Sequence, residues 1–519
     1  MILNENETIL TNIVILDMEK QTKMTRTESD LLGSVEVPEE VLYGVQTMRG
    51  LENFSISKFR LCDYPRFIEG LAIVKLGAAI ANHELGLLSD ELYEAIAQAC
   101  REIRDGKFHE FFPVDMIQGG AGTTTNMNAN EVIANRALEI MGHRRGEYQY
   151  CSPNDHVNCS QSTNDAYPSA IHLGLYATHL ELRQHLMELI AAFDRKGEEF
   201  ADVLKMGRTQ MQDAVPMTVG QEFHGWAVTI EEDVQRLTRT ATLFQEINLG
   251  ATAIGTGITS DPRYAKMATA NLAELTGIPF VVAADLVEAT SDTGAFVTFS
   301  GILKRIAVKI SKICNDLRLL SSGPRAGFHE INLPSVQPGS SIMPGKVNPV
   351  IPEVVNQVAF EVIGNDLSVT FAAEGGQLQL NAFEPVICFN ILESTRIMTR
   401  AMNTLADRCI AGITLNESVL EDYLRRSIGV VTALVPVLGY AASTEVAQAA
   451  LETGRPVADL VLERGLLDEE RLEGLLSPAS MTAPHRATAT GTIPVFEDVD
   501  DFERDSGEVG IPPADRADF

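Results

Sequence analysis

The clearest helical pattern in the chain is GILKRIAVKISKICNDLRLLS, residues 301–321. Its apolar residues recur in steps of three and four, and they are Leu303, Ile306, Ile310, Ile313, Leu317 and Leu320. The charged side chains that fall off this seam are Lys304, Lys309, Lys312 and Asp316. An apolar stripe with this spacing packs a helix side by side with other helices at a shallow angle. The segment therefore predicts a long helix in a bundle.

Four further segments are long and poor in proline, and they cover residues 169–199, 218–247, 352–375 and 388–410. Together with 301–321 they predict a bundle of five long helices, so the expected fold class is mainly α. One chain need not cover every apolar stripe by itself. We therefore expect a homo-oligomeric core.

The pattern changes along the chain and predicts five segments. Residues 1–25 are an extension, 26–160 form a mostly helical N-terminal domain, and 161–414 form the central bundle. Residues 415–484 form a small C-terminal helical domain, and 485–519 form an acidic tail that we expect to be disordered.

The composition excludes several classes of protein. Of 519 residues, 45% are apolar, which is enough for a large core and argues against a disordered chain. The formal charge is −30, from 71 acidic and 41 basic side chains, and this argues against a nucleic acid partner. The seven cysteines form no CxxC pair, which is typical of a reduced cytoplasmic protein without a zinc site.

We expect neither an export signal nor a membrane partner. The first ten residues, MILNENETIL, lack the basic and apolar regions of a signal peptide. The longest apolar stretch, 428–442, is interrupted by Gly429, Pro436 and Gly439. It is also shorter than the roughly 20 residues that a membrane-spanning helix needs.

Two polar segments interrupt the helical pattern in the first third of the chain. GGAGTTTNMNANE, 119–131, contains Thr123, and its glycines allow a ligand to approach the backbone. SPNDHVNCSQSTNDAYP, 152–168, offers hydroxyl and amide donors at Ser162, Thr163 and Asn164. The alternative for both is a turn and helix N-cap, where Ser, Thr and Asn are common.

PGSSIMPGKVNPVIPE, 338–353, is the most specific polar segment. Its glycines and prolines predict a loop that opens and closes over a ligand, followed by the start of a helix. Lys346 and Asn348 offer a cation and an amide at the positive end of that helix, which is a natural carboxylate site. The alternative is a flexible surface loop, and the apolar pair Ile342 and Met343, which looks buried, argues against it.

A fourth segment, GRTQMQDAVPMTVGQEF, 207–223, places Thr209 and Gln210 before another helix. Together the four segments offer neutral donors and one lysine, without a Cys/His metal cluster. His179 and His185 are six residues apart, which misses the four-residue spacing of a helical metal pair. Such a donor set suits removal of a carbon-bound proton beside a carboxylate, because it stabilises the doubly negative aci-carboxylate that forms. β-Elimination then expels the leaving group.

GSSIMPGKVNP, 339–349, resembles the signature of the fumarase/aspartase superfamily, and all four segments resemble stretches of that family in the same order. The resemblance spans about residues 26–480. It implies the three-domain fold of the family, in which a central five-helix bundle forms a twenty-helix core in a homotetramer. It also implies that each active site draws segments from three chains.

The resemblance implies a role for each matched residue. Ser340 matches the general base that takes the C3 proton, although a serine hydroxyl is a weak base unless water is excluded and donors hold the alkoxide. The residues matched to binding of the β-carboxylate are Thr123, Ser162, Thr163 and Ser341. Lys346 matches the partner of the α-carboxylate. The residues matched to orienting that carboxylate and the amino group are Asn164, Thr209 and Asn348.

Gln210 distinguishes between substrates of the family. Fumarases carry histidine at this substrate-binding position, paired with a downstream glutamate that remains here as Glu353. Glutamine cannot transfer a proton, so it suits the departure of ammonia better than that of hydroxide. Ser152 likewise replaces a histidine that fumarases tend to carry. The resemblance therefore implies an ammonia-lyase that reversibly deaminates L-aspartate to fumarate and ammonia.

Three alternatives stay open. The first is fumarate hydratase, which converts L-malate to fumarate and water. Argininosuccinate and adenylosuccinate lyases share the GSSxMPxK loop, but YGVQT, 43–47, and QGGAGTTTNMN, 118–128, favour the aspartase branch. A structural relative without activity is the third, and retention of the matched serine and lysine argues against it. We expect no required cofactor, with a divalent cation such as Mg²⁺ as an activator at most.

Overall fold

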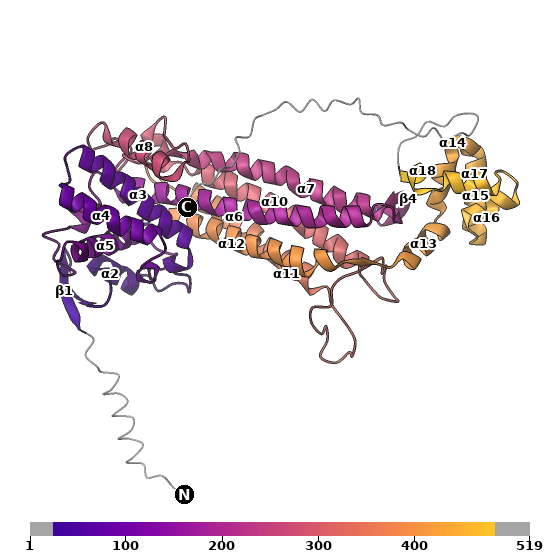
Figure 1. Cartoon of the computed structure of the whole chain (residues 1–519), viewed down its shortest axis with the longest axis horizontal. Helices are drawn as coiled ribbons and strands as arrows, with labels where there is room; N and C mark the ends of the chain where they lie inside the picture. The colour runs from indigo at the N-terminus through magenta and orange to yellow at the C-terminus, as the bar shows by residue number, and fades with distance from the viewer. Residues whose placement is uncertain (1–23, 483–519) are drawn as a thin grey trace, which may run out of the picture.

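The computed structural model describes residues 24–482. The chain is elongated, with an N-terminal helical part, a long central bundle and a small C-terminal part at the opposite end (Figure 1). The predicted tail over 485–519 lies outside the described residues, as does the predicted extension up to residue 23. None of the helices in the described part of the chain is both long and apolar enough to span a membrane.

The N-terminal part begins with an antiparallel hairpin of β1 (Thr25–Asp30) and β2 (Gly33–Pro38). Four helices follow, and they are α2 (Val45–Asn53), α3 (Pro65–Glu84), α4 (Asp90–Arg104) and α5 (Thr123–Ile140). α3 is buried along most of its length, because nearly all its residues are apolar or small. Its N-terminal proline occupies a first turn, where the missing N–H costs no helical hydrogen bond.

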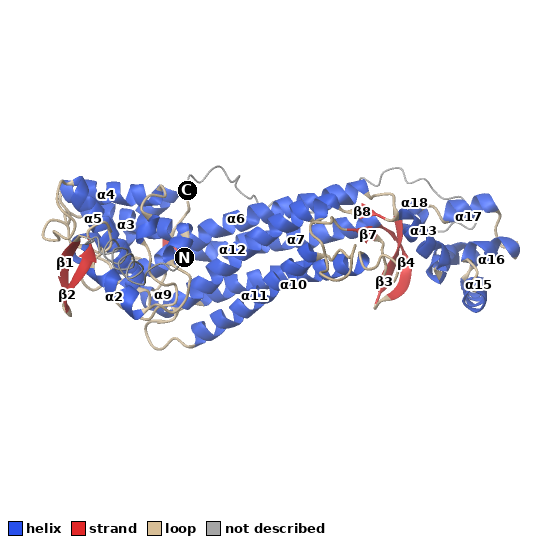
Figure 2. Cartoon of the chain, turned by 90° about the horizontal axis from the view of Figure 1, so that it is seen from below, coloured by secondary structure: helices blue, strands red, loops and turns tan. Residues whose placement is uncertain are grey.

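Five long helices form the central bundle, which confirms the prediction (Figure 2). They are α6 (Thr163–Glu199), α7 (Val219–Ala241), α10 (Gly294–Leu320), α11 (Val350–Glu374) and α12 (Glu384–Arg408). All six apolar residues of the 301–321 stripe are buried on α10. α10 packs against α7 and α11, so the predicted face is the one in contact.

Several helix boundaries differ from the predicted ranges, and α10 itself begins at Gly294, before the predicted segment 301–321. The helix predicted over 218–247 ends at Ala241, because a 3₁₀ turn (Thr242–Gln245) and the short strand β5 (Glu246–Ile247) follow. The helix predicted over 169–199 begins six residues earlier. Ser162 and Asp165 form a capping box that satisfies backbone groups there, and this fixes the start at Thr163.

Several small elements join the long helices. α8 (Tyr264–Thr276), β6 (Val281–Val282) and α9 (Leu286–Ser291) lie between α7 and α10 in sequence, and β6 pairs in parallel with β5. An antiparallel hairpin of β3 (Leu204–Thr209) and β4 (Gln212–Thr218) connects α6 to α7. β7 (Ile331–Asn332) pairs with β8 (Thr414–Leu415), which fastens the segment before residue 338 to the end of the bundle.

The C-terminal part consists of short helices, most of which pack around a core of their own. They are α13 (Glu417–Arg426), α14 (Val435–Leu438), α15 (Tyr440–Thr453), α16 (Val457–Glu463), α17 (Glu469–Leu475) and α18 (Pro478–Thr482). Leu434, Val446 and Val461 are fully buried in that core. The predicted domain boundaries stay a prediction.

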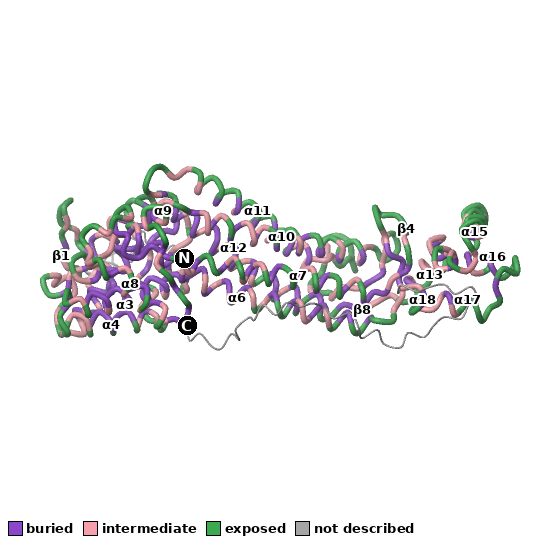
Figure 3. Tube along the Cα trace, turned by 90° about the horizontal axis from the view of Figure 1, so that it is seen from above, coloured by how far each residue is buried: buried purple, intermediate pink, exposed green. Residues whose placement is uncertain are grey.

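α11 differs from the other long helices in its exposure (Figure 3). Its exposed large apolar side chains are Val354, Phe360, Ile363, Leu367 and Phe371. The last four are spaced by three, four and four residues, so they share one face of the helix. A single chain thus leaves one apolar face of its bundle uncovered.

Candidate active site

The first donor-rich segment forms the start of α5. Gly120, Ala121 and Gly122 have positive φ angles of 85°, 52° and 85°, and the helix begins directly after them at Thr123. The Thr123 side chain is exposed, and its hydroxyl donates to the carbonyl oxygen of Gly120 at 2.8 Å. A non-glycine residue such as Ala121 is strained at positive φ, and strain of this kind gathers at functional sites.

The second segment forms the start of α6. One turn of π-helix (Pro153–Val157) precedes it, and Ser162 is the N-cap residue. The Ser162 hydroxyl oxygen accepts from the backbone N–H of Asn164 at 3.2 Å, and its O–H can still donate to a ligand. Thr163 is buried, whereas Ser162 and Asn164 are half-buried. The segment is a helix cap, and a cap of this kind can also offer donors to a ligand.

The starts of α5 and α6 lie side by side. Asn126 on α5 donates to Thr163 Oγ1 at 3.1 Å and to Asn158 Oδ1 at 3.2 Å. A Cβ atom on Gly122 would meet the Tyr167 ring at 2.6 Å, so only glycine lets the two helices approach so closely. The four predicted residues that this packing brings together are Thr123, Ser162, Thr163 and Asn164. Two positive helix ends also meet there, which favours an anionic ligand.

A buried cation that the sequence analysis missed lies next to this group. Lys75 on α3 is fully buried, and its Nζ donates to Asn158 Oδ1 and Gln161 Oε1, both at 2.9 Å. Burial lowers the pKa of Lys75 to about 7, against the attraction of Asp165. Burial also raises the pKa of Asp165 to about 6. In the sequence the only signal was a charge inside the apolar run LAIVKLGAA, 71–79.

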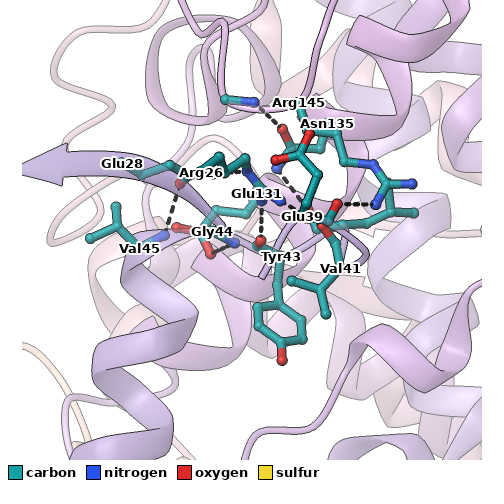
Figure 4. Close-up of polar contacts among 12 residues, drawn as sticks. Arg26, Glu28, Glu39, Val41, Tyr43, Gly44, Val45, Glu131, Asn135 and Arg145 are labelled. Atoms are coloured by element: carbon teal, nitrogen blue, oxygen red, sulfur yellow. Dashed lines mark hydrogen bonds and ion pairs between the residues drawn. The ribbon is translucent and has the colours of Figure 1, made fainter. Parts of the chain in front are cut away.

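The YGVQT stretch, 43–47, is anchored to α5 by a buried carboxylate (Figure 4). Glu131 accepts at 2.8, 2.7 and 3.0 Å from the backbone N–H groups of Gly44, Gln46 and Thr47. Burial raises the pKa of Glu131 to about 7, although these donors oppose the shift. Glu28 on β1 accepts from the N–H of Val45 at 2.9 Å. Glu131 therefore holds the positive end of α2 against the helix that carries Thr123, and Glu28 holds it against β1.

Ser340 lies on a loop that is held mainly by its own hydrogen bonds. The Gly339 N–H donates to the Lys346 carbonyl at 2.8 Å, and Asn348 Nδ2 donates to the Gly339 carbonyl at 2.7 Å, so the neck of the loop is closed. Ser340 Oγ accepts from the backbone N–H groups of Ile342 and Met343 at 3.2 and 2.9 Å. Both N–H groups would stabilise negative charge on this oxygen, which is what a serine base requires.

The rest of the loop is open to solvent. Ser341 and Lys346 are exposed, and Asn348 is half-buried at the neck. The expectation that Ile342 and Met343 are buried is wrong for a single chain, because their side chains are 84% and 47% exposed. α11 begins directly after Pro349, and Pro352 lies in its first turn, as the sequence predicted.

Thr209 and Gln210 lie at the tip of the β3–β4 hairpin, which the sequence analysis missed. Thr209 pairs with Gln212, so the turn has only two residues, and these are Gln210 and Met211 with φ angles of 53° and 64°. Such a turn normally takes Asn or Gly at its two positions, and Gln210 and Met211 are neither, so the sequence pattern did not reveal the hairpin. Thr209 and Gln210 are both exposed.

The predicted site residues fall into two groups within one chain. α6 has 37 residues and is therefore about 55 Å long, and it separates the group at its start from the hairpin beyond its end. Lys205 and Arg208 of the hairpin pair with Glu330 at 3.1 and 2.5 Å, ten residues before Ser340. The Ser340 loop therefore leaves the bundle in the half of the bundle that is nearer the β3–β4 hairpin (Figure 1).

No group of three or more His, Cys, Asp or Glu residues between 24 and 482 is placed to hold a metal ion. His179, fully buried, lies against the carbonyl oxygen of Tyr176, and His185 contacts Glu188 at 2.9 Å. The predicted site residues supply neutral donors, Lys346 and a serine whose oxygen faces backbone N–H groups, and Lys75 lies beside the donors at the start of α6.

Two family models match the chain. The model described as Lyase matches residues 33–364, and the model described as Fumarase C C-terminus matches residues 430–483. The first covers the helix bundle up to α11 together with all ten predicted site residues, and the second covers the small C-terminal part.

Relatives of high identity include aspartate ammonia-lyases of several bacteria. An aspartate ammonia-lyase of Pseudomonas canavaninivorans is 62% identical over 460 residues, which are 88% of this chain and 97% of the relative. An aspartate ammonia-lyase of Escherichia coli strain K12 is 55% identical over 88% of this chain and 96% of the relative.

Solved structures share the fold. A fumarate lyase:delta crystallin from Brucella melitensis bound to cobalt has a TM-score of 0.86 at 56% identity, covering 89% of this chain and 100% of that one. A class II fumarase from Schistosoma mansoni has a TM-score of 0.83 at 35% identity, with the same coverage. The identity to the fumarase is thus well below that to the ammonia-lyases.

Proposed function

Because the chain belongs to the aspartate ammonia-lyase branch of the fumarase/aspartase superfamily, we propose that it catalyses the reversible deamination of L-aspartate to fumarate and ammonia. This makes it a carbon–nitrogen lyase. The observation that carries the choice of substrate is Gln210 at the tip of the β3–β4 hairpin, where a hydratase needs a proton carrier.

The donors at the starts of α5 and α6 would hold the β-carboxylate of the substrate. Thr123, Ser162 and Thr163 supply hydroxyl groups, and Ser341 joins them from the loop. When the C3 proton leaves, this carboxylate becomes the doubly negative aci-carboxylate. Fixed donors and two positive helix ends stabilise that charge without having to reorient during the reaction.

Ser340 would take the C3 proton. The two N–H groups that its Oγ faces support this role, since they lower the cost of an alkoxide. Lys346 would pair with the α-carboxylate. The residues that would orient that carboxylate and the amino group are Asn164, Thr209, Gln210 and Asn348. Departure of ammonia from an already protonated amine then completes the elimination.

Fumarate absorbance in parallel assays with L-aspartate and L-malate tests the substrate. Fumarate from L-aspartate, with an equal amount of ammonia, would support the proposal. Fumarate from L-malate alone would overturn it in favour of a hydratase. An inactive protein with both substrates would overturn it in favour of a larger amino leaving group or a structural relative.

We further propose that the protein is a homotetramer whose active sites are shared among three chains. The uncovered apolar face of α11 supports an assembly, because a continuous row of exposed apolar side chains commonly marks an interface. The separation of the two groups of site residues within one chain supports shared sites.

The double variant F360E/F371E places two charges on that face of α11. Light scattering should find four chains for the natural protein and fewer for the variant, which should also lose activity. A variant that remains a tetramer would contradict the assignment of this face to the core.

The reaction as proposed needs no cofactor, and a divalent cation such as Mg²⁺ would act only as an activator. Activity that survives removal of divalent cations by EDTA would support this, and its full loss would overturn it. All seven cysteines are free thiols, five of them buried, which supports a reducing compartment such as the cytoplasm.

A further inference from the structure

Asp165 is a buried carboxylate near the candidate site, and both its oxygens accept hydrogen bonds. It is fully buried in the first turn of α6. Its Oδ1 accepts from the N–H of Ser162 at 2.9 Å, which is the ordinary contact of a capping box. Its Oδ2 accepts from the N–H groups of Gly250 and Thr252 at 3.1 and 2.8 Å.

The second set of contacts reaches a loop far away in the sequence. The loop over 248–253 returns to α6 at Asn164, whose Nδ2 donates to the Ala253 carbonyl at 2.8 Å. Asn248 Nδ2 donates in turn to the Asn164 carbonyl at 3.0 Å. Asn164 is therefore held at both its side chain and its backbone by a loop that the neighbouring carboxylate fixes.

The loop has little freedom of its own to take another position. Gly250 has a φ of 97°, and a Cβ atom there would meet Ala265 Cβ at 2.5 Å, so the backbone is pressed against α8. Thr252 has a φ of 57°, which is unfavourable for a β-branched residue. A strained backbone of this kind persists only where other contacts determine it, and the Asp165 carboxylate supplies two of them.

We propose that Asp165 is a positioning residue, which fixes the side chain of Asn164 by tying the start of α6 to the loop over 248–253. This inference rests on the proposed function, in which Asn164 orients the substrate. Asp165 itself does not contact substrate. Its carboxylate is needed rather than its size, because three backbone N–H groups face it and each requires an acceptor.

The variant D165N tests whether the carboxylate of Asp165 is needed rather than its size, because asparagine has nearly the same volume. Asparagine has one acceptor oxygen, so its NH₂ group would face either the Ser162 N–H or the two N–H groups of the loop. We expect the loop to move, Asn164 to lose its contact with Ala253, and kcat/KM for L-aspartate to fall about 10²-fold, as a shift of about 1 Å can cost.

A double-mutant cycle with N164A distinguishes positioning from a general loss of stability. If Asp165 acts through Asn164, D165N should cost less than about threefold in kcat/KM once Asn164 is absent. An equal cost in both backgrounds would overturn the proposal, and so would a normal kcat/KM for D165N alone.

The matched control is D233N in the middle of α7. Asp233 is also buried, and it pairs with Arg305 at 2.7 Å and Lys309 at 3.3 Å, far along the bundle from α6's start. D233N should lower the melting temperature but leave kcat/KM unchanged. An equal fall in kcat/KM for both variants would show that any buried charge has this effect, and would overturn the proposal.

A crystal structure of D165N gives a test that does not depend on the substrate. Loss of the contact between Asn164 Nδ2 and the Ala253 carbonyl would support the proposal even if L-aspartate were not turned over, and an unchanged 2.8 Å distance would overturn it. If D165N does not fold, N248A keeps the carboxylate and removes a second link between the loop and Asn164. The same cycle then applies, and additive costs would overturn the proposal.

Discussion

The donors at the start of α6 rest on buried side chains from three other elements, whereas Ser340 and Lys346 stand on a loop that is held mainly at its own neck. Asn126 from α5 donates to Thr163, the loop over 248–253 holds Asn164, and Lys75 from α3 donates to Asn158 and Gln161 just before the start of α6. The Ser340 loop closes only through Gly339, Lys346 and Asn348. The half proposed to bind the carboxylate is thus held by other elements of the same chain, and the half proposed to move the proton is exposed to solvent.

This contrast has a physical reason. Donors that stabilise developing charge work best when they are fixed before the reaction. A serine base instead needs water to be excluded at the moment of proton transfer, which a closing loop achieves. The structure of each half therefore suits its own part of the proposed reaction. Substitutions in the two halves should change the kinetics of the reaction in different ways.

Ser340→Ala should have the largest effect of a single substitution. Turnover of L-aspartate should fall by about 10²-fold or more, the usual scale for loss of a general base, while the oligomeric state stays that of the natural protein. Steady-state kinetics and light scattering measure both quantities. Near-normal turnover would remove Ser340 from the mechanism.

Mixed assemblies of two variants test the proposed sharing of active sites between chains. S340A and T163V damage opposite groups, so hybrids of the two should contain some sites with both groups intact. Activity of the co-expressed pair should exceed the sum of the separate variants by about tenfold, since each lesion alone costs about 10²-fold. S340A with K346A is the control that should show no gain, because both lie on one loop. A gain in neither mixture would place a complete site within one chain.

Lys346→Ala should mainly raise KM for L-aspartate. Loss of one charged hydrogen bond of about 2 kcal/mol corresponds to roughly a 30-fold increase, if the lysine binds ground state and transition state alike. Initial rates over a range of L-aspartate concentrations separate KM from kcat. A large fall in kcat at constant KM would contradict this role.

Lys75→Met should have a smaller effect than the substitutions above, and the effect should be on how the free energy of unfolding depends on pH. Burial lowers the pKa of Lys75 to about 7 from its usual 10.5, so between these values the unfolded chain binds a proton that the folded chain lacks. The free energy of unfolding should therefore rise with pH by up to about 1.4 kcal/mol per unit in this window, for the natural protein relative to K75M. Denaturant unfolding at pH 7, 8 and 9 measures the difference. Parallel pH profiles would mean that Lys75 does not titrate there.

The bundle was predictable because its signal is local. Steps of three and four along α10 follow directly from helix geometry, and the buried face of α10 matches them residue by residue. The start of α6 was less certain, since only the pairing of Ser162 with Asp165 decides it. Ile342 and Met343 were wrongly predicted to be buried, because apolar character alone does not tell whether one chain covers a side chain.

The candidate site was predictable by residue type but not by arrangement. Thr123 and the donors at 162–164 were found from composition, and the structure brings them together. Lys75 escaped notice because its partners at Asn158 and Gln161 lie more than 80 residues away in the chain. The hairpin at Gln210 escaped because its turn uses residues that rarely adopt positive φ.

The length of α6 has a consequence for how this protein can change over generations. One inserted residue would advance everything beyond it by about 1.5 Å and turn it by about 100° about the helix axis. The donors at its start and the hairpin beyond its end would then no longer face the same directions. Insertions should be rare in α6 among descendants of this gene, while point substitutions on its outer face remain acceptable. The length of α6 sets the distance and the relative orientation of the two groups. Selection should therefore preserve the length of this helix more strictly than its amino-acid composition.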